Sequence, residues 1–379
     1  MRLSRSNRAF GVKRFRLIAA FAVFFASACH TTAQSVVTQE LRIPIKGSGT
    51  LGLDAVMVRP NDSAPHPLAL FTHGTPRDSH DRAGMTPFAM QPQAIEFARR
   101  GWTVVIVLRR GFGESGGSYD EDAHACGHPD FVGATKESAK QLSEAVAYLS
   151  KRPEIDATRI IGVGVSTGGL AMVALTADPP PRLVAAISFA GGRGSQSPDV
   201  VCNADSLVDA FATFGKHSRI PMLWVYSQND HFFGPQLAQR FFHAFTIAGG
   251  NATFVLAPPF RNDGHHLFSL DGIPIWTPIV DEFLKAQNLT LRDTLLPPLE
   301  PPKIDPPTWL PEKLRPAFNK YLLLPPHKAM AISGSGHFGF SFGRATEKEA
   351  QEKALENCKE FAPANDRCEI VFAEDAKTR

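Results

Sequence analysis

Cysteine, tyrosine and tryptophan are scarce in this sequence, and so are long hydrophobic runs. The 379 residues include five cysteines, four tyrosines and four tryptophans. The apolar stretch Leu17–Ala28 is too short to span a bilayer comfortably, and we expect no membrane span in the rest of the chain. The cysteines include no C-x-x-C pair, so a structural zinc site is not expected and neither is any other metal.

The N-terminus indicates an export signal. The apolar stretch is preceded by six basic residues and no acidic ones, namely Arg2, Arg5, Arg8, Lys13, Arg14 and Arg16. We expect residues 1–33 to be a signal peptide cleaved after Ala33, which makes the protein periplasmic or secreted. The alternative is cleavage after Ala28, which would leave Cys29 as the site of a lipid anchor.

Basic residues are in excess only because of this leader. The whole chain has 40 basic and 37 acidic residues, and without the leader 40 − 6 = 34 basic residues face 37 acidic ones, a formal charge of −3. A basic face that could neutralise phosphates is therefore not expected, and nucleic acid is not an expected partner.

Four cysteines remain once Cys29 is set aside with the signal. An even number of cysteines in an exported chain favours disulfides over free buried thiols, which are the alternative. Cys358 and Cys368 are close in sequence and far from the other two, so the expected pairs are Cys126–Cys202 and Cys358–Cys368.

Apolar segments alternate with helical ones from about residue 36 to residue 287. Two strands are expected first, at 36–45 and 53–60. They are followed by strands near 68–74, 103–110, 160–165, 183–192, 221–230 and 251–259, and by helices near 87–100, 131–151, 170–175, 204–215, 235–248 and 276–287. This alternation predicts an α/β fold with a mainly parallel sheet covered by helices on both faces, and reactive groups at the carboxyl ends of the strands.

Repeated prolines separate this unit from the C-terminal part. The segment PPLEPPKIDPPTWLP, residues 297–311, cannot form a regular helix or a central strand. We expect a catalytic domain over 34–292, a Pro-rich linker over 293–320 and a small disulfide-stapled α+β domain over 321–379. In the small domain, Phe338, Phe340 and Phe342 are interpreted as the core of a small sheet, with a surface-binding module as the alternative.

A serine stands where the sequence passes from a strand to a helix. The segment RIIGVGVSTGGLAMVAL, residues 159–175, places Ser166 in a G-x-S-x-G pattern between a β-branched run and an alanine-rich run. A serine in such a turn has its hydroxyl exposed above the sheet, and the flanking glycines let neighbouring chain pack close. Ser166 is therefore a candidate nucleophile.

An acid and a base follow the serine in the order that a serine hydrolase needs. Asp230 ends the strand PMLWVYSQND, and His265 and His266 follow the last strand of the sheet in FRNDGHHLF. We favour His265 as the base because Gly264 permits the tight turn that would direct its imidazole at Ser166. The three residues predict a Ser166–Asp230–His265 triad.

Two loops are expected to complete the site. The oxyanion hole would use the backbone N–H of Thr167 and a second donor from Gly74 or Thr75. The glycine-rich segment LRRGFGESGGSYD, residues 108–120, matches a dinucleotide-binding pattern only weakly. It is interpreted as the rim of the active site, where Arg110 and Glu114 hold each other or a polar group of the substrate.

Together these motifs make the chain similar to a known superfamily. The segments THGTP, RRGFGESGG, GVSTGG, FAGGRG, LWVYSQNDHFFGP and DGHHLF, spread over about residues 40–290, resemble the α/β-hydrolases, and in particular the dienelactone hydrolase-like secreted serine hydrolases. That resemblance implies Ser166 as nucleophile, Asp230 as acid and His265 as base. This chain has serine where dienelactone hydrolases carry cysteine, so the resemblance does not imply lactone specificity.

The expected function is hydrolysis of a small carboxylic ester through an acyl-enzyme, with no cofactor. One alternative is a serine peptidase of the prolyl-oligopeptidase type, acting on short peptides through a subsite for the substrate amine. The other is a noncatalytic binding protein on the same scaffold.

Overall fold

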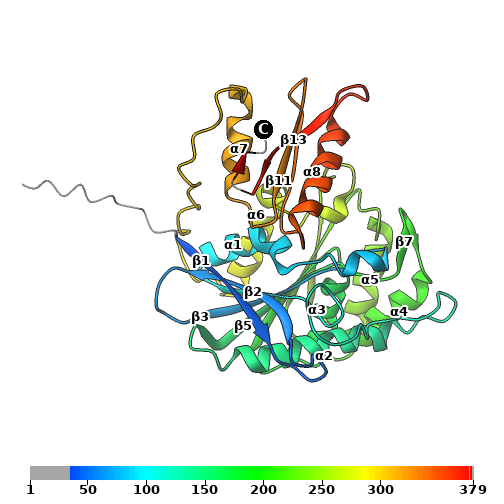
Figure 1. Ribbon diagram of the computed structural model, residues 1–379. Coiled ribbons are helices and arrows are strands. Elements are labelled where there is room, and N and C mark those ends of the chain that lie inside the picture. The colour runs from blue at the N-terminus through cyan, green and yellow to red at the C-terminus, as the bar shows by residue number, and fades with distance from the viewer. Residues whose placement is uncertain (1–34, 375, 378–379) are drawn as a thin grey trace, which may run out of the picture. The chain divides into compact units, whose positions relative to one another are not determined.

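The computed structural model describes residues 35–374 and 376–377, so the expected signal peptide lies outside the described residues. An eight-stranded sheet has the strand order β1-β2-β4-β3-β5-β6-β9-β10 (Figure 1). Its strands are β1 (Val36–Ile43), β2 (Leu53–Pro60), β3 (His66–Thr72), β4 (Thr103–Val107), β5 (Ile155–Val165), β6 (Leu183–Phe189), β9 (Met222–Ser227) and β10 (Ala252–Ala257). Only β2 runs antiparallel to its neighbours. The predicted α/β fold with a mainly parallel sheet is confirmed.

Helices cover both faces of this sheet, and each face has its own apolar core. One core joins the sheet to α2 (Phe131–Leu149), α3 (Thr167–Ala177), α4 (Ala204–Gly215) and α5 (Pro235–Ile247). The other joins it to α1 (Gln91–Arg99) and α6 (Ile273–Ala286). Because both faces are covered, the central strands are continuous apolar runs, and all five residues of β4 are buried.

Short elements connect these strands and helices. The structure has 3₁₀ turns η1 (Ser79–Arg82), η2 (Pro87–Met90), η3 (Gly264–His266) and η4 (Glu312–Leu314), and a small ribbon of β7 (Ser195–Ser197) and β8 (Val200–Val201). The ribbon was not predicted. It lies after β6, at the carboxyl end of the sheet, where the candidate serine also lies.

The C-terminal residues form a second, antiparallel sheet of order β12-β11-β13-β14. Its strands are β11 (Ala329–Ser333), β12 (Phe338–Ser341), β13 (Cys368–Ala373) and β14 (Ala376–Lys377), and its helices are α7 (Arg315–Leu322) and α8 (Glu347–Phe361). The three phenylalanines at 338, 340 and 342 pack against an apolar cluster that includes Phe318 and Tyr321 of α7. Helix α7 was not predicted, and it begins inside the segment expected to be a linker.

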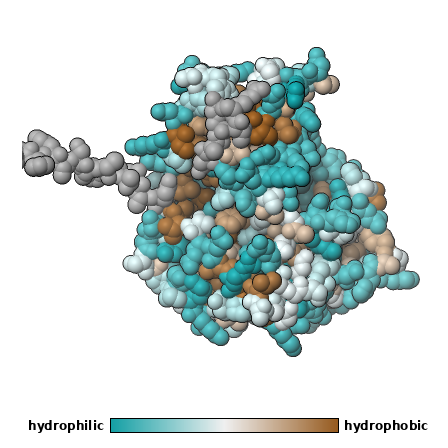
Figure 2. Space-filling view, viewed as in Figure 1, coloured by the Kyte–Doolittle hydropathy of each residue, from teal (hydrophilic) through white to brown (hydrophobic). Residues whose placement is uncertain are grey.

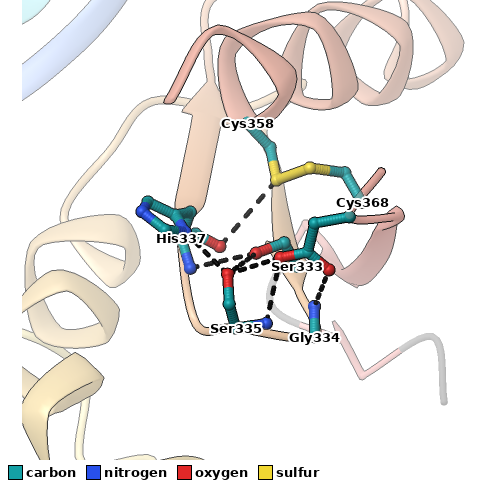
Figure 3. Close-up of a disulfide and its surroundings, with 7 residues drawn as sticks. Ser333, Gly334, Ser335, His337, Cys358 and Cys368 are labelled. Atoms are coloured by element: carbon teal, nitrogen blue, oxygen red, sulfur yellow. Dashed lines mark hydrogen bonds between the residues drawn. A yellow bond between two sulfur atoms is a disulfide. The ribbon is translucent and has the colours of Figure 1, made fainter. Parts of the chain in front are cut away.

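A disulfide between Cys358 and Cys368 joins α8 to β13 (Figure 3). Beside it, the turn after β11 hydrogen-bonds the carboxylate of Asp366 through the backbone N–H groups of Gly334 and Ser335 and the Ser335 hydroxyl. These bonds, led by the one from Ser335, lower the pKa of Asp366 to about 2. The disulfide and this turn fix one end of the small sheet.

The surface shown in Figure 2 is mostly hydrophilic, with small separate hydrophobic patches. Exposed large apolar side chains such as Leu51, Ile247 and Phe361 are scattered along the chain. Over residues 35–374, none of the helices combines the length and the apolar character needed to cross a membrane.

Candidate active site

Ser166 lies in a strained turn between β5 and α3. Its backbone has φ 56° and ψ −121°, a conformation that side-chain-bearing residues rarely adopt and that recurs at catalytic turns. The glycines on either side allow this turn. A Cβ on Gly164 would lie 2.1 Å from the carbonyl oxygen of Gly168, and one on Gly168 would lie 2.5 Å from that of His73. The G-x-S-x-G spacing therefore has a steric cause in this fold.

Asp230 and His265 form a buried pair after neighbouring strands. Asp230 follows β9, and His265 lies in η3 after β10. The imidazole Nδ1 of His265 is 3.2 Å from each carboxylate oxygen of Asp230. The backbone N–H groups of Phe232 and Phe233 donate to Asp230 Oδ1 at 2.7 and 2.9 Å. The carboxylate is thus held in place by two backbone donors while it orients the imidazole.

Gly264 has a different role from the one expected from the sequence. We expected Gly264 to permit a tight turn. In the structure this residue must be small because the end of another strand lies close to it. A Cβ on Gly264 would lie 2.4 Å from the side chain of Ser227 at the end of β9. The residue next to His265, His266, is exposed, whereas His265 is buried and pairs with Asp230.

Ser166 lines a cavity of about 250 Å³, together with residues from both loops expected to form the oxyanion hole. Thr75, Thr167, Phe232 and Phe233 are among the lining residues. The ring of Phe232 stacks on His265 with 3.8 Å between centroids, so Phe232 connects the cavity wall to the His265–Asp230 pair. The predicted triad residues thus lie around one end of the sheet.

The two candidate oxyanion donors lie on loops that are hydrogen-bonded to each other. Thr75 Oγ1 and Thr167 Oγ1 share a hydrogen bond of 2.9 Å. Helix α3 begins at Thr167, so the N–H of Thr167 has no acceptor within the helix and can donate to a developing oxyanion. Gly74 packs against the serine, because a Cβ there would lie 2.9 Å from Ser166 Cβ.

His73 fixes the shape of the loop that carries Thr75. Its Nε2 accepts a hydrogen bond of 3.0 Å from the backbone N–H of Arg109, so its proton is on Nδ1, which donates to the Gly74 carbonyl at 2.6 Å. Burial, and then the nearby Arg109 guanidinium, hold the pKa of His73 well below its usual range. A neutral imidazole therefore supports the loop.

A buried ionic cluster lies behind the same two loops. Arg109 Nε donates to Glu121 Oε1 at 2.5 Å, and Arg193 Nη2 is 3.3 Å from Glu121 Oε2. Other N–H groups of Arg109 donate to the His73 carbonyl at 2.8 Å and to Thr167 Oγ1 at 3.2 Å. All three charged side chains are at least nine-tenths buried. Arg109 thus bonds to both candidate oxyanion segments, a contact that no pattern in the sequence indicates.

The predicted rim residues lie elsewhere. Arg110 pairs with Asp120, and Glu114 pairs with Arg42 on β1. Neither of them lines the cavity of Ser166, and they do not contact each other. The expectation that these two residues hold each other is not met, because each pairs with another residue of opposite charge, and contact of either one with a substrate group stays a prediction.

The disulfide Cys126–Cys202 forms part of the cavity wall. Cys126 belongs to the long segment between β4 and α2, and Cys202 immediately precedes the N-cap of α4. The structure therefore contains both of the expected disulfides, and one of them is at the candidate site. In the part of the chain that the structure describes, no group of three or more His, Cys, Asp or Glu side chains could hold a metal ion.

The strand order and the strained serine turn between β5 and α3 decide the fold. This is an α/β-hydrolase fold. Residues 48–203 match the model of the X-Pro dipeptidyl-peptidase (S15) family, which is less than half of the chain. That match includes Ser166 and both candidate oxyanion segments and ends before Asp230 and His265.

Solved structures similar to this chain include an esterase and a peptidase. The Pyrococcus furiosus esterase Pf2001 is 16% identical, with 67% of this chain and 90% of that chain covered and a TM-score of 0.44. The Pyrococcus horikoshii acylaminoacyl peptidase is also 16% identical, with 69% and 43% covered and a TM-score of 0.47. The comparison with curated proteins finds no match to this sequence.

Proposed function

We propose that this protein is a serine hydrolase that cleaves a carboxylic ester through an acyl-enzyme. The observation that carries the proposal is the buried His265–Asp230 pair, which packs against Phe232 in the wall of the cavity that Ser166 lines from its strained turn. A serine hydroxyl needs such a histidine to accept its proton, and the histidine needs a carboxylate to orient it.

The proposed reaction uses the described residues in two half-reactions. The Ser166 Oγ bonds to the ester carbonyl carbon while its proton passes to His265 Nε2. The backbone N–H groups of Thr167 and Thr75 stabilise the oxyanion. The carbon–oxygen bond to the alcohol then breaks, and the alcohol leaves with the proton from His265. Water repeats these steps on the acyl-enzyme and releases the acid and free Ser166.

A peptidase is the second candidate, because the family model that matches residues 48–203 describes X-Pro dipeptidyl-peptidases. An enzyme that removes dipeptides from a free N-terminus needs a negative group for the substrate ammonium. Among the described residues that line the cavity, Glu121 is the only acidic one, and its carboxylate is bound by two arginines. This arrangement favours an ester over a peptide with a free N-terminus as the substrate.

The disulfides also bear on where the protein acts. Disulfides persist in oxidising compartments, so the Cys126–Cys202 and Cys358–Cys368 bonds support export to the periplasm or the medium.

A fluorophosphonate probe tests the proposal directly. Intact-mass spectrometry of the purified protein should show one adduct, and peptide mapping should place it on Ser166. Ser166→Ala should show no adduct, and Asp230→Asn should react at least about 10²-fold more slowly, because its histidine is no longer oriented for proton transfer. A folded wild-type protein that gains no adduct would favour the noncatalytic binding protein instead. If the adduct forms, hydrolysis of matched ester and X-Pro amide substrates then separates esterase from peptidase.

A further inference from the structure

Arg109 is bonded to both segments that carry the candidate oxyanion donors. These segments are residues 74–75, after β3, and Thr167, at the start of α3. An oxyanion hole stabilises the reacting oxygen only while its donors stay about 2.7–3.1 Å from the position of that oxygen. Two donors on separate segments therefore need a connection that fixes the spacing between them.

The side chain and the backbone of Arg109 hold the first segment at its base. Nη1 of Arg109 donates to Thr72 Oγ1 at 2.7 Å and to the His73 carbonyl at 2.8 Å. The backbone N–H of Arg109 donates to His73 Nε2 at 3.0 Å, and His73 Nδ1 donates to the Gly74 carbonyl. One arginine thus fixes the two residues before Gly74.

The same guanidinium reaches the second segment through the Thr167 hydroxyl. Nη2 of Arg109 donates to Thr167 Oγ1 at 3.2 Å, and that oxygen shares a hydrogen bond of 2.9 Å with Thr75 Oγ1. The Thr167 hydroxyl therefore connects Arg109 to both segments. A lysine at position 109 could not make all these bonds together, because its donors are on one nitrogen, whereas those of a guanidinium are spread over a planar fork.

Burial and charge hold Arg109 in this position. The side chains of Arg109 and Glu121 are both 0% exposed, and Arg109 Nε donates to Glu121 Oε1 at 2.5 Å. Burial acts to raise the pKa of Glu121, but the charges of Arg109 and Arg193 outweigh it and hold the pKa below its usual value. Glu121 is thus ionised, and moving Arg109 away would leave a buried charge without one of its partners.

We propose that Arg109 is a positioning residue of the oxyanion hole, and that it sets the spacing of the Thr75 and Thr167 N–H groups through the Thr167 hydroxyl. This inference rests on the proposed serine hydrolase function. An oxyanion forms in both half-reactions, so a displaced donor slows acylation and deacylation alike. The loss should therefore appear in kcat, whereas KM should change little.

A substitution of Thr167 that keeps its shape tests this without removing a buried charge. Thr167→Val retains the backbone N–H and loses only the hydroxyl. We expect kcat on a small p-nitrophenyl ester to fall about tenfold, less than the about 10²–10³-fold lost with a whole donor, and KM to stay within about twofold. A trifluoromethyl ketone, whose adduct with Ser166 carries an oxyanion, should inhibit more weakly by the same factor. Thr167→Ser, which has a hydroxyl, should lose much less kcat than Thr167→Val.

Arg109→Lys tests the guanidinium itself, and Arg100→Lys is the matched control. Arg100 is also buried and pairs with Glu96 and Asp281, but it does not line the cavity of Ser166. Arg109→Lys should lower kcat about tenfold or more, and Arg100→Lys should leave it unchanged. Circular dichroism and thermal melts show whether each variant is folded, and Thr167→Val decides the question if Arg109→Lys is not.

Two results would overturn the positioning role while leaving the hydrolase in place. One is wild-type kcat in Thr167→Val. The other is an equal loss of kcat in Arg109→Lys and Arg100→Lys, which would show a general effect of removing a buried guanidinium. Absence of the fluorophosphonate adduct on folded wild-type protein would instead overturn the hydrolase function itself.

Discussion

The imidazole of His73 is a buried group whose charge state follows from its hydrogen bonds. One ring nitrogen accepts from the Arg109 backbone and the other donates to the Gly74 carbonyl. Protonation would place a second donor opposite the Arg109 N–H, next to a guanidinium and away from water. The conformation of the loop that carries Thr75 therefore depends on His73. In the sequence alone, nothing distinguishes this histidine beyond its place before Gly74.

The low pKa of His73 predicts a loss of stability in mild acid. Above the ordinary histidine pKa of about 6.5 both states are neutral, so stability is full there. As pH falls from about 6.5 towards the folded-state pKa, the unfolded chain binds a proton that the folded chain does not, and the free energy of unfolding drops by up to about 1.4 kcal/mol per pH unit.

Urea unfolding of the wild-type protein and of His73→Asn, measured between pH 5 and pH 8, checks this. The variant should be less stable at pH 8 by about 1–3 kcal/mol, because the Arg109 N–H loses its acceptor. It should also lose less stability than the wild type between pH 7 and pH 5, since the other histidines titrate equally in both proteins. Parallel pH profiles would show that His73 does not titrate as proposed.

At the scale of elements, the segment between β4 and α2 forms one wall of the candidate site. Residues 108–130 contain no helix or strand, and they supply Tyr119, Glu121, Cys126 and Pro129 to the cavity. Next to the cavity, the Glu121 ion pairs and the Cys126–Cys202 disulfide hold this segment in place. The cavity wall is therefore irregular backbone fixed by side-chain bonds.

Replacing both cysteines of this disulfide should affect stability and substrate binding together. The double variant Cys126→Ser, Cys202→Ser is expected to lose about 2–4 kcal/mol of stability, because the unfolded chain is no longer cross-linked over 76 residues. It should also show a raised KM, since the 108–130 segment is then less well ordered at the cavity. Steady-state kinetics and thermal melts measure the two effects.

The matched control is the other disulfide, which lies outside the cavity. Cys358→Ser with Cys368→Ser should leave KM for a small ester unchanged, although it removes the bond between α8 and β13. If both double variants raised KM equally, the effect would be a general loss of stability rather than a change in the cavity wall.

The fold and the triad candidates were predictable from the sequence because their signals are local. The central strands of the sheet are apolar runs, and Ser166, Asp230 and His265 each follow a strand. Helix α7 was missed because prolines surround it, although Pro316 stands in its first turn, where proline is tolerated.

The ionic cluster could not be predicted in the same way. Arg109, Glu121 and Arg193 come from segments after β4 and β6, and only the folded sheet brings them together. The sequence does place two arginines after β4, and we assigned the site role to Arg110. Arg109 is the one that is fully buried and bonded to both candidate oxyanion segments, and the difference is set by which side of the strand end each residue faces.

At the scale of the whole molecule, the C-terminal sheet contacts the segment that carries the candidate base. Lys320 of α7 donates to Asp271 at 2.5 Å, and Asn262 donates to Glu360 of α8 at 2.9 Å. Leu270 packs against the apolar cluster of α7. The contacted residues lie on both sides of His265 in the sequence. The C-terminal residues therefore support the loop that carries this histidine.

Deleting residues 297–379 should therefore lower kcat on a small soluble ester by about tenfold or more, because a loosely held histidine is displaced from its position for proton transfer. A module that only bound a surface would leave kcat unchanged when removed. The truncated protein should first be shown to fold by circular dichroism and thermal melting. Lys320→Ala combined with Glu360→Ala gives the same test in the full chain and should lower kcat by a smaller factor, with Lys348→Ala, exposed on α8, as the control. A truncated protein with wild-type kcat would mean that the residues before 297 position His265 without the C-terminal part.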